Sequence, residues 1–290
     1  MVGVGCSAPV IDEDEIADAA EGMTRGIVLV ERVAASDGAT QTNVSAKFMR
    51  VSASADPELA ERVVGSRLDL PAALPGCMIV PSGGADEVAP SLVALGRVVL
   101  MDAGDDVSIK TGDEVIPLDR RAFPDVGGAV FGQFYTSRDA TSAIPAPAKY
   151  VLESSGSAEM DRLAIEAEAP AAPEDVLVAE QLLADGVTLQ EGTGAQVHWR
   201  SGEAGSRDLV YVDVNSTANG ATVRCAFHDV GEGSIPASFL RSEALGSFPA
   251  AATVAVHRVR KSSIGAPGID DGEMRFDLGV VGHATLGATQ

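Results

Sequence analysis

The sequence predicts an all-β protein built from two consecutive antiparallel β-sandwich domains. Apolar and polar residues alternate with a period of two, as in residues 42–48, where Val44, Ala46 and Phe48 share one face. Glycine, proline, aspartate and asparagine interrupt the apolar runs at short intervals, which indicates turns between short strands. Helical periodicity is confined to two short segments, so helices are expected to contribute little.

Residues 26–168 are expected to form the first sandwich. The segment 110–114 (KTGDE) has the composition of a hairpin turn between two strands. A short helix is predicted over 57–64, because Asp56 is a good N-cap and Pro57 suits the first helical position. The strands are expected at about 26–34, 42–51, 77–81, 97–102, 107–110, 114–118, 128–136, 149–153 and 162–168.

Residues 174–290 are expected to form the second sandwich, of immunoglobulin size and type. Pro170 and Pro173 lie in an alanine-rich stretch, which predicts a stiff connection between the domains. A second short helix is expected at 174–184, and Trp199 is expected to fill the space between two sheets. The strands are expected at about 187–190, 195–200, 208–215, 221–228, 234–235, 253–261 and 274–283.

The N-terminal residues 1–25 are expected to form a disordered acidic tether that ends a lipoprotein signal. Val4-Gly5-Cys6 places small residues before a cysteine, as the lipoprotein peptidase requires, so Cys6 is the expected lipidation site. Only five residues precede Cys6, and the basic start and apolar segment of a signal peptide are missing. The alternative is a chance small-residue tail with an exposed thiol. Ser7 after the cysteine favours outer-membrane placement.

Net charge excludes some classes of partner. The chain carries 21 basic and 42 acidic residues, for a net charge of −21. Such a chain repels nucleic-acid phosphates and anionic lipid heads, so no nucleic-acid partner is expected. Contact with a membrane is expected only through the lipid anchor. The 1 Trp, 3 Tyr and 8 Phe offer few rings on which sugars could stack.

The second domain resembles a group of uncharacterised bacterial envelope lipoproteins. The resemblance rests on a cysteine-bearing strand (VRCAFHD, 223–229), an Ile-Pro-Ala-x-x-Leu segment (235–240) and a closing strand (TVAVHR, 253–258). It covers residues 187–286 moderately well and residues 26–168 only loosely. It implies immunoglobulin-like or fibronectin-like β-sandwich modules on the cell envelope and no particular chemistry.

Two further features concern disulfides and metals. Cys77 and Cys225 are expected to be buried free thiols, with a disulfide as the alternative in an oxidising compartment. The four histidines (His198, His228, His257 and His283) lack metal-ligand spacing, so no zinc site is expected. Two acidic turns are weak calcium candidates, although aspartate is also a natural turn residue. Their carboxylates are Asp102, Asp105, Asp106, Asp270 and Asp271.

No catalytic motif emerges, and no cofactor is expected. The chain has no Gly-x-Ser-x-Gly elbow, phosphate loop or dinucleotide fingerprint. The sequence therefore predicts a non-catalytic, exported lipoprotein of the outer membrane or periplasm, with a binding or structural role toward an envelope protein or glycan. The alternative is an envelope hydrolase, acting on glycan or ester, whose site assembles from β-strand loops. A deep pocket with a perturbed carboxylate or histidine would favour the hydrolase, and a shallow apolar patch would favour binding.

Overall fold

The protein is all-β, as predicted. The computed structural model describes residues 22–80, 96–137, 144–203, 207–217 and 219–288. Strands account for 56% of the described residues and helices for 6%. The expected tether and Cys6 lie outside the described residues, except that Met23 already begins the first strand.

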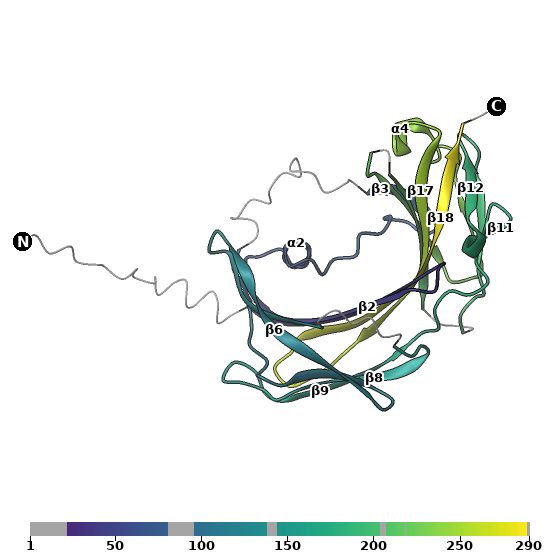
Figure 1. Cartoon of the computed structure of the whole chain (residues 1–290). Coiled ribbons are helices and arrows are strands. Elements are labelled where there is room, and N and C mark those ends of the chain that lie inside the picture. The colour runs from purple at the N-terminus through teal and green to yellow at the C-terminus, as the bar shows by residue number, and fades with distance from the viewer. Residues whose placement is uncertain (1–21, 81–95, 138–143, 204–206, 218, 289–290) are drawn as a thin grey trace, which may run out of the picture.

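Most strands belong to one 14-stranded, strongly curved sheet (Figure 1). Strand β12 (Val187–Gln190) pairs with β18 beside the main path. The order along the path is β3 (Gly76–Val80), β15 (Thr222–His228), β14 (Leu209–Ser216), β17 (Ala250–Ser263), β18 (Asp271–Gly287), β1 (Met23–Ala35), β2 (Thr40–Val51), β4 (Val98–Leu100), β7 (Val130–Thr136), β6 (Glu114–Val126), β5 (Val107–Thr111), β8 (Ala148–Ser154) and β9 (Leu163–Ala169).

A separate four-stranded sheet replaces the helix expected at 174–184, so that prediction was wrong. Its order is β11 (Gln181–Leu182), β10 (Leu177–Val178), β13 (Ala195–His198) and β16 (Glu232–Ile235). Leu177 pairs with both Leu182 and His198, so β10 lies between two strands. The helical pattern is too short to prevail over these long-range hydrogen bonds. Only a single 3-10 turn, η1 (Leu183–Asp185), remains helical there.

Strand β6 folds the large sheet back on itself. Its first residues pair with β5 and its later residues pair with β7, so β5, β8 and β9 form a second layer. Figure 1 shows β8 and β9 beneath β2. The buried residues between these layers form what we call core A. They include Val28, Val30, Val44, Phe48, Ile109, Tyr150, Leu152, Leu163, Ile165, Met274 and Phe276.

A second buried cluster, core B, lies between the four-stranded sheet with β12 and the end of the large sheet. Trp199 is 5% exposed there, so the expected filling of the space between two sheets is observed. Other members of core B are Val178, Leu183, Leu189, Val197, Val210, Val212, Val223, Cys225, Phe227, Val254 and Val256.

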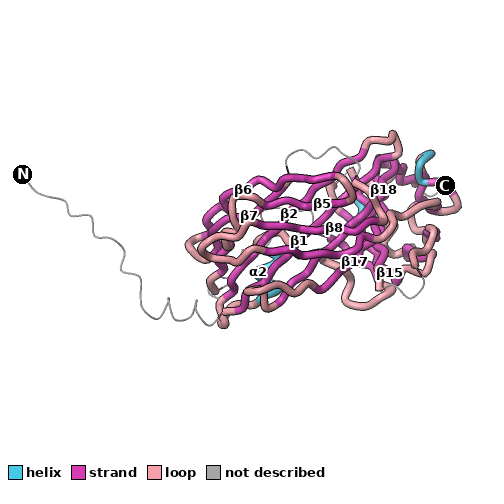
Figure 2. The backbone as a smooth tube through the Cα atoms, turned by 90° about the horizontal axis from the view of Figure 1, so that it is seen from below, coloured by secondary structure: helices cyan, strands magenta, loops and turns pink. Residues whose placement is uncertain are grey.

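The large sheet crosses the expected boundary at 169–173. Strand β1 pairs in parallel with β18 over Arg25 to Ala35, and β3 pairs with β15. The β17–β18 hairpin contributes Met274 and Phe276 to core A and Val254 and Val256 to core B. Figure 2 shows the strands of the large sheet running side by side along the molecule. Ranges 26–168 and 174–290 therefore share one sheet, and their independence as folding units stays a prediction.

The concave side of the sheet is covered by a short helix and an extended strap. Helix α2 (Pro57–Val63) begins as predicted, because the Asp56 carboxylate accepts from the backbone N–H groups of Glu58 and Leu59. We call residues 65–75 the strap. Its apolar side chains Leu68, Leu70 and Leu74 pack on Tyr211, Ala226 and Val259. A second short helix, α4 (Ser242–Leu245), lies beside β15 near the C-terminus.

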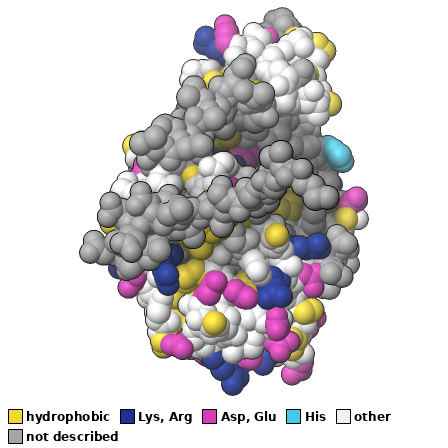
Figure 3. All heavy atoms as spheres, turned by 90° about the vertical axis from the view of Figure 1, so that its left-hand side faces the viewer, with side chains coloured by type: hydrophobic (Ala, Val, Ile, Leu, Met, Phe, Trp, Pro, Cys, Tyr) yellow, Lys and Arg dark blue, Asp and Glu magenta, His cyan; other side chains and the backbone are white. Residues whose placement is uncertain are grey.

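Charged side chains are mixed on the surface. Figure 3 shows Asp and Glu interspersed with Lys and Arg on the face at the left of Figure 1. The excess of acidic residues is therefore distributed there without separating into a single patch.

Within the described residues, no helix has the length and hydropathy needed to cross a membrane.

Candidate functional site

An apolar pocket lies where β18 changes its partner strand. Strand β1 pairs with β18 up to Val281, and β12 takes over the same strand from Ala284. Between them, Leu183 of η1 packs against Gly282, where a Cβ atom would lie 2.4 Å from the Leu183 carbonyl oxygen. Residues of η1 thus pack into the break between β1 and β12, and a recess remains beside them at the end of β1.

The recess is lined mainly by aliphatic side chains. Its volume is about 310 Å³, at the lower end of the roughly 300–1,000 Å³ typical of small-molecule sites. Three segments build it: the β1–β2 turn, residues 173–184 and the middle of β18. The lining residues are Ala34, Ala35, Ser36, Gly38, Pro173, Asp175, Val176, Leu182, Leu183, Ala184, Val280 and Val281. We call this recess the β18 pocket.

Strained backbone adjoins the β18 pocket. Within the described ranges, the non-glycine residues with positive φ are Asp175 (53°), Ala179 (49°) and Glu180 (61°). Ala179 and Glu180 form the two-residue turn between β10 and β11, since Val178 pairs with Gln181. Such a turn needs positive φ at both central residues and normally selects Asn-Gly. Left-handed backbone at non-glycine residues is costly and concentrates at functional sites.

Carboxylates lie in and next to the segments that line the β18 pocket. Asp175 lines it, and the exposed residues Asp37, Glu174 and Asp185 are sequence neighbours of lining residues. The guanidinium of Arg200 forms ion pairs with Glu174 and Asp175. Neither the lining residues nor their immediate sequence neighbours include another lysine or arginine. The lining segments and their sequence neighbours therefore carry a net negative charge.

A second polar cluster lies on the concave face, beneath the strap. Asp277 on β18 accepts a hydrogen bond from the Tyr211 hydroxyl at 2.7 Å and contacts His257 Nδ1 at 2.6 Å. The rings of Tyr211 and His257 stack with centroids 4.4 Å apart. Burial, followed by the charge of Asp277, raises the pKa of Tyr211 above its ordinary value. The hydroxyl therefore stays a proton donor to Asp277.

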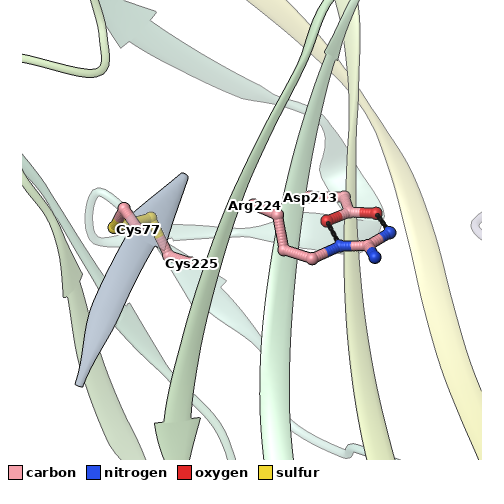
Figure 4. Close-up of a disulfide and its surroundings, with 4 residues drawn as sticks. All are labelled: Cys77, Asp213, Arg224 and Cys225. Carbon is pink, nitrogen blue, oxygen red and sulfur yellow. Dashed lines mark hydrogen bonds and ion pairs between the residues drawn. A yellow bond between two sulfur atoms is a disulfide. The ribbon is translucent and has the colours of Figure 1, made fainter. Parts of the chain in front are cut away.

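Further contacts fix the two sides of this cluster. The Arg224 guanidinium lies over the Tyr211 ring and binds both oxygens of Asp213 at 2.8 and 2.7 Å (Figure 4). A Cβ atom on Gly279 would lie 2.7 Å from the His257 ring, so glycine is needed beside the imidazole. Arg224 also donates to the strap carbonyl of Asp69 at 2.9 Å. The cluster thus joins β14, β15, β17 and β18 and binds the strap to them.

Arg258 holds the connection between the two expected domains. Only 1% of the residue is exposed, and its five N–H groups all find acceptors. Two go to Asp229, which also accepts from the Trp199 indole at 2.6 Å, and three go to backbone carbonyls. These carbonyls belong to Ala171, Ala172 and Arg200. Such complete pairing indicates a structural role for the buried charge.

Four of the five weak calcium candidates are engaged in internal contacts. Asp102 accepts from the Tyr135 hydroxyl at 2.6 Å, and this bond is the first cause that lowers the Asp102 pKa. Asp102 and Asp105 also contact Arg120 at 3.0 and 3.2 Å. Asp270 accepts from the Thr24 backbone, Asp271 pairs with Arg25, and the Asp106 side chain is exposed. Across the described part of the chain, no group of three or more His, Cys, Asp or Glu residues could hold a metal ion.

The histidines lie apart on β13, β15, β17 and β18. His198 contacts Glu180 at 3.8 Å, His257 contacts Asp277, and His228 and His283 are exposed. The four histidines thus lie on four different strands and do not form one cluster.

The expectation of free thiols was wrong, because Cys77 and Cys225 form a disulfide (Figure 4). Sequence alone does not show that β3 pairs with β15 and places these residues directly opposite each other, with Cα atoms 4.0 Å apart. The bond joins residues separated by 148 positions.

Sequence reasoning also missed the β18 pocket. Its residues come from three distant segments, and no motif marks them. The Ala179-Glu180 turn lacks the Asn-Gly signature that would have revealed the hairpin.

Comparison with known proteins does not assign a family. No family model and no curated protein matches the chain. Solved structures similar to it include Rst D1-D2, at 6% identity and a TM-score of 0.16, covering 66% of this chain and 88% of that one. Another is the Fcho1 mu homology domain of Danio rerio with a bound Eps15 peptide, at 9% identity and a TM-score of 0.24, covering 94% and 100%. Likeness at these TM-scores supports no argument about function.

Proposed function

We propose that this protein is a non-catalytic binding protein of the cell envelope, exported and held at a membrane through a lipid on Cys6. The Cys77–Cys225 disulfide carries the proposal. Structural disulfides form and persist outside the reducing cytoplasm, in the periplasm or at the cell surface. A bond between residues 148 positions apart also stabilises a small edge strand, β3, that has little core of its own.

The binding role is supported by the distribution of apolar and ionisable groups. The β18 pocket is apolar and adjoins strained backbone, as ligand sites often do. The polar cluster on the concave face instead consists of groups paired with one another beneath the strap. Reactive chemistry would require such groups to be directed at a substrate.

An envelope hydrolase is the second candidate, favoured by the His257–Asp277 contact. A carboxylate that orients an imidazole is part of many hydrolytic sites. Replacement of His257 by Ala would separate the two candidates. A binding protein retains its ligand affinity when folded, whereas a hydrolase loses turnover of envelope esters or glycans.

Fractionation of the source cells tests the main proposal. Free thiols are alkylated before lysis, and the fraction that contains the protein is identified by immunoblotting. The mass of the N-terminal peptide is then measured by mass spectrometry. The expected result is an envelope protein acylated at Cys6, with Cys77 and Cys225 protected until reduction. A cytosolic protein with both cysteines alkylated before reduction would contradict export.

A further inference from the structure

We propose that the β18 pocket binds the alkyl chain of an amphipathic molecule with a cationic head group. This inference rests on the proposed binding role and adds a site and a ligand class to it. Four features of the pocket carry it: its lining, its charge, its backbone and its position beside the break in the pairing of β18.

The lining selects an aliphatic group. Pro173, Val176, Leu182, Leu183, Val280 and Val281 present saturated carbon, and alanines complete the walls. None of the described lining residues carries an aromatic ring on which a sugar or a planar ligand could stack. An alkyl chain buries apolar surface against such walls without needing directed partners.

Nearby carboxylates select the charge of the head group. Asp175 lies in the wall, and Asp37, Glu174 and Asp185 are exposed residues next to lining residues along the chain. Arg200 compensates only part of this charge, through its pairs with Glu174 and Asp175. The chain as a whole carries a net charge of −21, so an approaching cation is attracted and an anion is repelled.

The backbone and the topology explain why this recess is retained. Asp175, Ala179 and Glu180 hold left-handed conformations in the segment that forms one wall. The opposite wall is β18 at Val280 and Val281, the last residues that pair with β1 before the break between β1 and β12. The recess lies at the margin of core B, to which the lining residues Val176 and Leu183 belong.

Calorimetric titration of the full chain with alkyltrimethylammonium salts tests the inference. The salts are used below their critical micelle concentrations. From hexyl to decyl, affinity is expected to rise up to about fourfold per methylene, as apolar burial dictates. Decanoate, with an anionic head, is expected to bind at least tenfold more weakly than decyltrimethylammonium. Equal affinity for decanoate, or affinity independent of chain length, would overturn the proposal.

Variants locate the binding site. Leu182→Gln and Ala184→Phe alter exposed lining residues and are expected to weaken decyltrimethylammonium binding at least fivefold. The matched control is Val230→Gln, which changes a 67% exposed valine away from the pocket and is expected to leave binding unchanged. Asp175→Asn removes the charge but keeps a residue that tolerates positive φ. It should reduce the preference of the pocket for decyltrimethylammonium over decanoate. Circular dichroism confirms that each variant is folded, and unchanged affinity in folded Leu182→Gln and Ala184→Phe would overturn the assignment.

The outcomes distinguish this inference from the proposed function. An envelope protein with an intact disulfide that binds none of the probes refutes the ligand class and retains the proposed function. A cytosolic, reduced protein that binds them refutes the envelope role and retains the pocket.

Discussion

The Cys77–Cys225 disulfide is expected to supply a large part of the stability of this protein. The bond closes a loop between residues 148 positions apart. The chain-entropy relation gives about 5 kcal/mol for a loop of this length, and measured effects are typically about 2–4 kcal/mol. Because total domain stabilities are about 5–15 kcal/mol, reduction should change the unfolding midpoint substantially.

Urea unfolding followed by circular dichroism, with and without reductant, measures this effect. Reduced protein keeps both sulfur atoms in place, so the comparison isolates the bond from the packing of Cys225 in core B. The expected result is a free energy of unfolding lower by about 2–5 kcal/mol after reduction. Cys77→Ala with Cys225→Ala serves as the control, because its midpoint should not respond to reductant. A wild-type midpoint that stays constant while two thiols are titrated would refute the reasoning.

Three further predictions concern local features. Ala179→Asn combined with Glu180→Gly should raise the free energy of unfolding by about 1–2 kcal/mol, because both residues hold positive φ; a lower thermal midpoint would count against a type I′ turn. Gly279→Ala should lower the free energy of unfolding by about 1–3 kcal/mol through a clash with the His257 ring. In a double-mutant cycle, the same substitution should lower it much less when His257 is already Ala. An equal loss in both backgrounds would exclude the clash. Burial raises the pKa of Tyr135, Tyr150 and Tyr211, and that of Tyr150 reaches about 12. The tyrosines of the folded state therefore resist ionisation, whereas those of the unfolded state ionise near pH 10. The free energy of unfolding should therefore be unaffected below pH 10 and should decline as the pH rises toward 12. Little tyrosinate absorbance at 295 nm should appear before the protein unfolds. Gradual ionisation of the three tyrosines in the folded protein would contradict this prediction.

Local sequence patterns located most of the strands. The alternation of Val44, Ala46 and Phe48 correctly placed these side chains on one buried face of β2. Asp56 and Pro57 correctly marked the start of α2. Both predictions succeeded because period-two burial and helix capping depend on neighbours within a few residues.

The helix expected at 174–184 failed for the opposite reason. Leu177 and Val178 pair with His198 and Val197, about twenty residues away, and those hydrogen bonds determined the local conformation. The β18 pocket, the candidate site, could not be predicted either, since Ala35, Leu183 and Val280 meet only after the sheet is assembled.

The sequence by itself determined the fold class, the net acidic charge and the positions of most strands, because these follow from composition and from short-range periodicity. Only the tertiary structure decided that β1 joins β18, that Cys77 meets Cys225, and that a recess opens where the pairing of β1 with β18 ends. Strand partners are chosen by contacts between distant segments, and the alternation of side chains along one strand carries no record of which strand will lie beside it.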